Sequence, residues 1–315
     1  MDWSANNAPK LGPDSIWMYR NRGSNPPLCE NVGTRVDAMA RIEGTLQAAL
    51  KLKRRLFIGL DFGFGYPLGS AAVMGLGNSA RSNWLDRVKS LMGAHQISGR
   101  PSWLDVWSTI CARIEDSKDN ESNRFDVASQ LNALFRSALG ETPFWGMPHT
   151  HAGRYADLGP TRPSYRSIDE KRIVETMLPS AQPQWKLAYT GSVGSQSLLG
   201  IAHFGRLRAQ YGDVVAIWPF ETRFAQDLSK PVVVAEIYPS MLPVTQRNGE
   251  VKDAAQVRTM ADTFARLDAD GGLETLLSAP PGLTAVQTSV VLREEGWIVG
   301  VGHDLGRAQT VASSL

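Results

Sequence analysis

The stretch that most constrains the fold is residues 56–67, with the sequence LFIGLDFGFGYP. A short continuous apolar run, with β-branched and aromatic residues and a Gly/Pro stop, predicts a buried β-strand. Asp61 stands where the apolar run gives way to glycines. A carboxylate there must be paired, hydrogen-bonded or bound to a metal, because burying it alone is very costly. Ligands of open α/β sheets bind at the carboxyl ends of the strands, which makes Asp61 the first candidate residue of a site.

The segments before this strand predict the opening of a mixed α/β sheet. Residues 15–20 and 27–32 have the composition of strands, and Thr34 is placed to cap a helix that runs to Lys53. One face of that helix is apolar, with Val36, Met39, Ile42, Leu46 and Leu50. Asp2 fits the end of a further strand, but only Met1 precedes it. Either this strand is truncated, or Asp2 is a terminal surface residue.

Residues 70–190 interrupt the sheet pattern, and we interpret them as a helical and loop-rich insertion within a single domain spanning 1–315. Helices are predicted at 80–92, 103–115, 126–139 and 168–177. A second domain is the alternative, although no clean linker separates it. The sheet pattern resumes at 214–220 and 231–239, followed by a helix beginning at Asp253. Residues 294–301 fit either a last strand or a packed tail.

Composition narrows the class of protein. Of the 315 residues, 43% are hydrophobic and 20% charged, which is typical of a globular protein. The net charge of +2 does not by itself indicate a nucleic-acid binder. No apolar run approaches the roughly 18 residues of a membrane span, and no signal peptide is visible. We therefore expect a cytoplasmic protein without a membrane partner.

Four acidic residues occupy similar positions along the chain. Asp2, Asp61 and Glu236 end predicted strands, and Asp253 begins the helix after the last of them. If the strands are neighbours, these carboxylates converge and repel each other unless hard cations lie between them. Two such cations, Mg²⁺ or Mn²⁺, can activate a water and stabilise the leaving oxygen of a phosphodiester. The alternative is that each acid is a solvent-exposed strand end or, for Asp253, a helix N-cap.

A second candidate site precedes the apolar helical run 198–207. Small residues at a helix start can bind a phosphate through their backbone N–H groups, and here they are Gly191, Ser192, Gly194, Ser195 and Gln196. The segment is not a P-loop, because the Gly-Lys-Ser/Thr ending is missing. The alternative is a tight turn with Ser192 or Ser195 as N-cap. Lys186, Arg206 and Arg208 lie nearby in sequence and would suit a phosphate backbone.

Four segments, DWSA at 2–5, IGLDFGFGYP at 58–67, VAEIYP at 234–239 and KDAAQV at 252–257, resemble a largely uncharacterised bacterial family of predicted nucleases with a ribonuclease H-like fold. Some members are labelled molybdopterin guanine dinucleotide synthesis proteins. The resemblance implies a mixed sheet in the order 3-2-1-4-5 and metal ligands at Asp2, Asp61 and Asp253. Gln256 stands where many such enzymes have a second acid on the last helix.

Together these patterns lead us to expect a metal-dependent nuclease with a two-metal mechanism, using Mg²⁺ or Mn²⁺ and a nucleic acid or nucleotide substrate. The metals would be held by Asp2, Asp61, Glu236 and Asp253. The alternative is a non-catalytic nucleotide- or phosphate-binding accessory protein on the same fold, linked to molybdopterin cofactor synthesis. An actin-like ATP-binding fold is disfavoured, because residues 5–12 lack a glycine-rich hairpin. Substrate, pathway and oligomeric state are left open.

Overall fold

The computed structural model describes residues 1–4, 7–22, 25–75 and 102–303, and over these ranges the chain forms a mixed α/β structure. The strands are β1 (Ile16–Arg22), β2 (Asn25–Val32), β3 (Leu56–Leu60), β4 (Val215–Ile217) and β5 (Val232–Glu236). The longer helices are α1 (Arg35–Lys51), α4 (Trp103–Arg113), α5 (Arg124–Leu139), α7 (Val193–Tyr211) and α8 (Lys252–Ala269). Shorter ones are α2 (Ser70–Gly75), α6 (Ile173–Thr176), α9 (Leu273–Leu277) and α10 (Ala285–Val290). The expected helix at 80–92 lies outside the described residues.

Two sheets replace the single sheet that the resemblance implies. β3, β5 and β4 form a parallel sheet with β5 in the middle, and β1 pairs with β2 antiparallel. The expected order 3-2-1-4-5 is therefore not observed. Residues 1–3 are too short to form a strand of the usual length. They nevertheless lie between the sheets, because the Asp2 N–H donates to Trp17 O at 2.9 Å and the Met1 amino group donates to Gly59 O at 2.8 Å.

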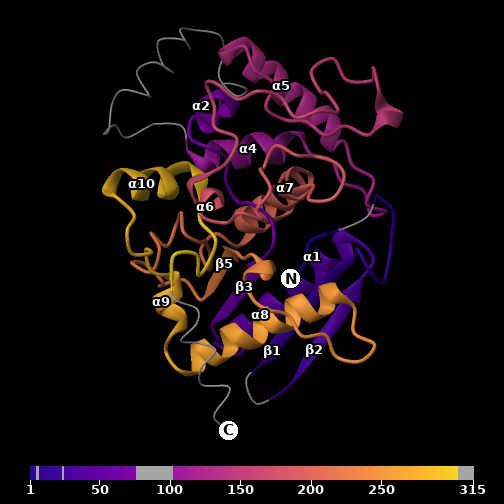
Figure 1. Cartoon of the computed structure of the whole chain (residues 1–315). Helices are drawn as coiled ribbons and strands as arrows, with labels where there is room; N and C mark the ends of the chain where they lie inside the picture. The colour runs from indigo at the N-terminus through magenta and orange to yellow at the C-terminus, as the bar shows by residue number, and fades with distance from the viewer. Residues whose placement is uncertain (5–6, 23–24, 76–101, 304–315) are drawn as a thin grey trace.

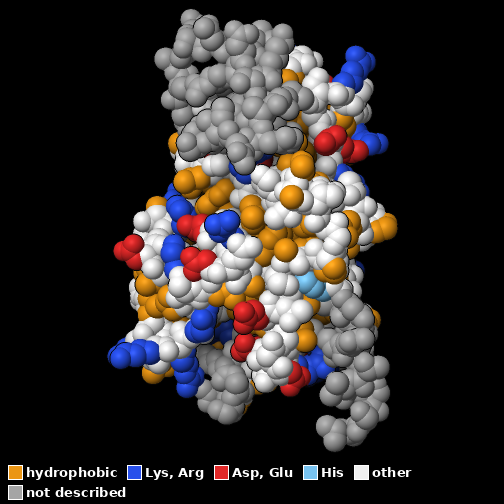
Figure 2. Space-filling view, turned by 90° about the vertical axis from the view of Figure 1, so that its left-hand side faces the viewer, with side chains coloured by type: hydrophobic (Ala, Val, Ile, Leu, Met, Phe, Trp, Pro, Cys, Tyr) orange, Lys and Arg blue, Asp and Glu red, His pale blue; other side chains and the backbone are white. Residues whose placement is uncertain are grey.

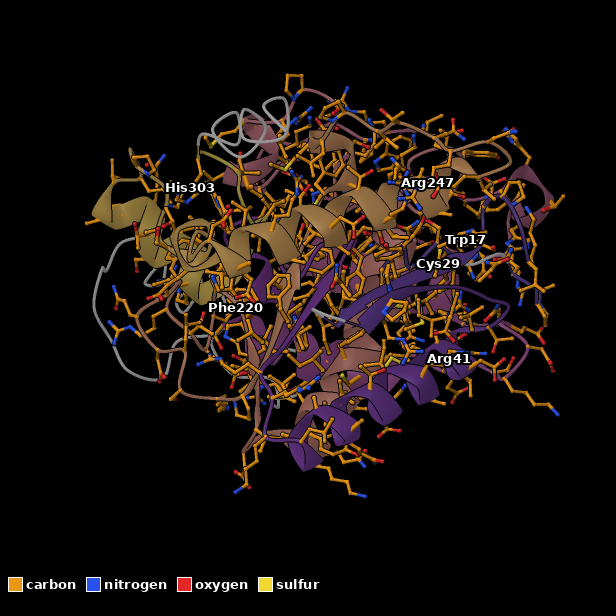
Figure 3. The ribbon with its side chains drawn as sticks, turned by 90° about the horizontal axis from the view of Figure 1, so that it is seen from below. Trp17, Cys29, Arg41, Phe220, Arg247 and His303 are labelled. Carbon is orange, nitrogen blue, oxygen red and sulfur yellow. The ribbon has the colours of Figure 1, made fainter. Side chains whose placement is uncertain are left out.

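The parallel sheet is covered on both faces, as such sheets require. Along β5, Val232 and Val234 belong to the apolar core shared with α1 and α7, whereas Val233 and Ala235 belong to the core shared with α8. This alternation follows from the two-residue repeat of a strand. Seen from below, α1, which carries Arg41, and α8 lie on opposite sides of the strands that carry Trp17 and Cys29 (Figure 3).

The helices of the expected insertion pack above the sheets. Figure 1 shows α2, α4 and α5 of this segment together in the upper half with α7, which follows it in sequence, and β1, β2, β3 and α8 lie below them. The α1 side of the sheet and these helices share one continuous core, which includes Leu60, Phe62, Trp107, Leu131 and Phe204. The end of β3 therefore lies between the sheet layer and the helical layer.

Several local predictions can be compared with the structure. Thr34 caps α1 as expected, accepting from the Asp37 N–H, but Val36 is exposed rather than buried. Only residues 173–176 of the expected helix 168–177 are helical. Asp253 lies in the first turn of α8, and the N-cap is Val251. No helix among the described residues is long and apolar enough to cross a membrane.

Candidate functional site

The site centres on the turn after β3 and the segment 1–4 beside it. Asp61 is half-buried, and its Oδ1 accepts the Trp3 N–H at 2.7 Å. The neighbouring carboxylate, Asp2, is buried, and its Oδ1 accepts the Ser4 N–H at 2.7 Å. Backbone donors thus fix one oxygen of each carboxylate. The chain places two acids side by side that are 59 residues apart in sequence.

Burial and like charge disfavour ionisation of this pair. The pKa of Asp2 is raised to about 6, first by burial and also by the Asp253 carboxylate, while the Ser4 hydrogen bonds lower it. The pKa of Asp61 lies well above its usual value, first through burial and then through the Asp2 carboxylate. The Met1 amino group lowers both pKa values, but burial lowers its own pKa and so favours its neutral form. When both carboxylates are charged, the pair is therefore undercompensated: the backbone hydrogen bonds and the Met1 amino group do not offset the burial and the neighbouring negative charge.

Asp253 approaches this pair from α8. It is half-buried, and its Oδ2 accepts the Asp14 N–H at 2.9 Å. Side chains along a strand alternate between its two faces. Phe57 packs on the α8 face of the sheet, and Asp61, four residues later, belongs to the same face, which is the one that Asp253 approaches. Of the four acids that the sequence predicts to converge, the structure places Asp2 and Asp61 side by side, and Asp253 lies near enough to Asp2 to raise its pKa.

Glu236 does not join them, which corrects the expectation of a four-acid cluster. In the parallel register Glu236 pairs with Leu60, so its side chain shares the face of Leu60. The next residue, Asp61, belongs to the opposite alternation. The Glu236 carboxylate is instead buried against Arg172, with Oε1 2.6 Å from Nη2 and Oε2 2.8 Å from Nη1. A carboxylate held in this way by a guanidinium is not available to a metal.

The surroundings of Arg172 form a buried polar network. Its guanidinium also donates to Glu175 Oε1 at 3.0 Å and to the Glu295 carbonyl at 2.9 Å, and Phe64 N–H donates to Glu236 Oε2 at 2.9 Å. Burial opposes the charge on Arg172, but Glu236 and Glu175 outweigh it and raise the arginine pKa. The network is a structural element that ties α6 to the end of β5.

Few side chains that could bind a metal ion lie near Asp61. Within the described ranges no three His, Cys, Asp or Glu side chains converge closely enough to form a metal cluster. Asp2 and Asp61 are an all-oxygen pair, which suits a hard cation. Mg²⁺ is usually bound by one or two carboxylates, with waters and substrate phosphates as the other ligands. These residues therefore fit one such cation rather than a carboxylate-bridged pair of cations.

A pocket with a volume of about 340 Å³ lies next to the segment that holds this pair, and neither Asp2 nor Asp61 is itself among its lining residues. Trp3 and Ser4 line it from the segment that holds Asp2 and Asp61, and Asp14 lines it from the loop bonded to Asp253. The start of α7 forms another wall through Ser192, Ser195 and Gln196. Gln196 Nε2 donates to Ser4 Oγ at 2.9 Å, which joins this wall to the segment that holds Asp2.

Two arginines supply positive charge to the pocket. Arg35 is paired with the buried Asp116, at 2.6 Å from Nε and 2.7 Å from Nη2. Arg124 is 9% exposed, and its described hydrogen bonds go to the neutral side chains of Ser195, Ser122 and Asn7. The pKa of Arg124 is lowered to about 10, first by burial and then by the Arg35 charge. The Arg124 charge is the least compensated one in the pocket wall.

Only part of the predicted phosphate-binding segment, residues 191–196, lines the pocket. Ser192, Ser195 and Gln196 line the pocket, as a binding role requires. The two glycines are explained by the backbone. Gly191 has a φ of +79°, a conformation that favours glycine, and a Cβ on Gly194 would lie 2.4 Å from Gln184 O. The Gly194 N–H donates to Lys186 O at 2.8 Å, so it is not free for a phosphate.

The basic residues expected near this loop have other partners. Lys186 donates to Thr190 O, Arg206 to Ile114 O, and Arg208 to Glu221. Sequence reasoning missed Arg124 and Arg35. Arg124 is the first residue of α5, where the helix dipole disfavours a cation. That unfavourable position was the available signal that Arg124 has a role other than stabilising its helix.

Comparison of the chain with models of protein families, with curated proteins and with solved structures finds no match in any of the three.

Proposed function

We propose that this chain is a metal-dependent phosphodiester hydrolase that acts on nucleic acid, with Asp2 and Asp61 as the ligands of one Mg²⁺ or Mn²⁺ ion. The observation that carries the proposal is the undercompensated pair of carboxylates beside an arginine-lined pocket. A divalent cation would offset the burial and the neighbouring negative charge that raise the two pKa values.

Each group would have a defined task. When bound, the cation supplies Lewis acidity for a phosphoryl oxygen and for an attacking water. The N–H groups of Ser4 and Trp3 hold the carboxylates in position. Arg124 and Ser195 lie across the pocket and would orient the phosphate. Asp253 adds negative charge near Asp2, which would strengthen cation binding without direct ligation.

The test is a cleavage assay with single-stranded DNA, RNA and branched DNA in Mn²⁺. Removal of one ligand charge in Asp61→Asn is expected to lower the cleavage rate at least about 100-fold, since metal-dependent stabilisation of the transition state is worth several kcal/mol. Asp268→Asn, on the exposed last turn of α8, is the matched control and should stay within about twofold. Equal rates in Asp61→Asn and the unsubstituted protein, or no cleavage in either, would contradict the proposal.

A second function is favoured by the small donor set. Among the described residues no third acid completes a metal cluster, and Gln256 stands where a further acid would help. These features fit a nucleotide- or phosphate-binding accessory protein, for which the resemblance suggests a link to molybdopterin cofactor synthesis. Calorimetry separates the two functions: an accessory protein binds nucleotide through the pocket but shows no Mn²⁺ binding that depends on Asp61.

A further inference from the structure

The pocket beside Asp2 contains a buried positive charge that lacks a counter-ion. None of the ion pairs found among the described residues includes Arg124. The nearby Asp116 carboxylate is already held by Arg35 and His203. Burying an unpaired guanidinium is costly, and an anion in the pocket would offset that cost. The wall at Arg124 is therefore suited to a phosphate or another small anion.

Polar and apolar side chains share the rest of the pocket wall. On its apolar side Phe125, Leu187 and Leu199 are buried, and Trp3, Pro148 and Ala188 also line it. Tyr189 also lines the pocket but is 55% exposed, and its φ of +70° is rare for an aromatic residue. Strained backbone of this kind persists where the surrounding structure imposes it, often at ligand sites. An exposed aromatic ring at a pocket wall is a ready surface for stacking a base.

Size limits what the pocket can hold. Its volume of about 340 Å³ lies at the lower end of the range for small-molecule pockets, roughly 300–1,000 Å³. That is room for one nucleotide but not for a base pair with its two backbones. Figure 2 shows a different face, the side of α9 and α10 in Figure 1, on which the described basic and acidic side chains are interspersed.

We propose that this pocket binds a single unpaired nucleotide, with its phosphate at Arg124 and its base against Tyr189. The proposal rests on the proposed function, because it names the substrate class of the same site: single-stranded nucleic acid. Gln196 and Ser4 line the pocket, and Ser4 also donates its backbone N–H to Asp2, so the acids are bonded to residues of the pocket wall. Duplex substrates would need an unpaired end or an extruded base to reach the acids.

The test measures binding without catalysis. Thymidine 5′-monophosphate, thymidine and inorganic phosphate are each titrated by calorimetry into the full chain in EDTA. The monophosphate should bind more tightly than either part alone. Tyr189→Ala should weaken it about 5- to 100-fold and Tyr189→Phe should not, because stacking needs only the ring. Arg124→Gln should weaken it about 10- to 100-fold.

Two controls separate binding from folding. Arg136→Gln removes an exposed guanidinium from the same helix, α5, where it pairs with Asp157, and should leave binding unchanged. Tyr189 is exposed, so its variants test the proposal even if Arg124→Gln destabilises the fold. Asp61→Asn should still bind the monophosphate in EDTA. That result keeps the binding proposal separate from the hydrolase proposal.

The outcomes are distinct. Absence of monophosphate binding would overturn the inference even if the chain cleaves nucleic acid in Mn²⁺. Inorganic phosphate binding as tightly as the monophosphate, with no effect of Tyr189→Ala, would also overturn it, since the pocket would then be an anion site without base recognition. Tight monophosphate binding in a chain that never cleaves would support the inference and remove the hydrolase.

Discussion

At the end of β3, Asp61 lies beside the Asp2 carboxylate, whereas at the end of the neighbouring strand β5, Glu236 lies against a guanidinium. Both acids follow a short apolar strand, and the two strands pair in parallel. The Asp61 side is undercompensated for its charge, and the Glu236 side is held by Arg172 from 64 residues away. The same sequence pattern thus leads to a candidate cation site in one place and to a buried ion pair in the other.

Which face of the sheet each acid lies on determines which groups surround it. Glu236 shares the face of Leu60, under α6 and the segment 291–295, which bring Arg172 and Glu295 to it. Asp61 belongs to the face covered by α8, which brings Asp253. Glu236 pairs with Leu60, and Asp61 is one residue further along, so the two acids lie on opposite faces of the sheet. One of them forms a buried ion pair, and the other belongs to the candidate site.

The largest expected effect concerns the buried ion pair. Arg172→Met should lower the free energy of unfolding by about 3–5 kcal/mol, because it leaves Glu236 and Glu175 buried without their cation. Urea denaturation measures the change. Arg172→Met combined with Glu236→Gln should be more stable than Arg172→Met alone, since one uncompensated charge is gone. A loss below about 1 kcal/mol for Arg172→Met would show that the pair is not buried as described.

The second prediction concerns the acids at the end of β3, where removing a charge should raise the free energy of unfolding rather than lower it. The pKa of Asp2 is about 6 in the folded chain against 3.8 when unfolded, so its ionisation destabilises the fold progressively from about pH 4 to pH 6. Asp2→Asn should therefore raise the free energy of unfolding by about 1–3 kcal/mol at pH 7.5 and leave it nearly unchanged at pH 4. Both measurements use urea denaturation in EDTA. A loss of stability at pH 7.5 would contradict the undercompensated pair.

A third prediction concerns the cation itself. At ten times its dissociation constant, Mn²⁺ should raise the free energy of unfolding by about 1.4 kcal/mol at pH 7.5, because it binds only the folded acids. Thermal unfolding should show the gain in the unsubstituted chain and in Glu236→Gln, but not in Asp61→Asn. An equal gain in all three would place the cation elsewhere.

Much of the sheet could be predicted from local sequence. The apolar runs ending at Leu60 and Glu236 form strands, and Thr34 caps its helix, because these depend on short patterns and local hydrogen bonds. The single sheet could not be predicted correctly, because residues 1–3 form bonds to both sheets without forming a strand. The α/β class depends on periodicity, whereas sheet order depends on distant pairing.

The candidate site was partly predictable for the same reason. Asp2, Asp61 and Asp253 follow from strand ends and a helix start, but the register that turns Glu236 away is set by pairing with β3. Arg124 lies 122 residues from Asp2 in sequence and reaches the pocket only through the packing of α5 against α7. Side chains that meet through helix packing leave only indirect signals in the sequence.

The smallest effect tests whether Asp253 belongs with the acids at β3. Asp253→Asn removes a charge that raises the pKa of Asp2, so the loss of stability between pH 4 and pH 6 should shrink by about 0.5 kcal/mol. It also removes a favourable charge from the first turn of α8. Asp37→Asn, an exposed first-turn acid of α1, removes the same helix-dipole contribution without touching Asp2. The difference between the two variants, measured by urea denaturation across this pH range, isolates the charge coupling. If both variants change the pH dependence equally, Asp253 is only a helix-start residue, and the acids at β3 reduce to Asp2 and Asp61.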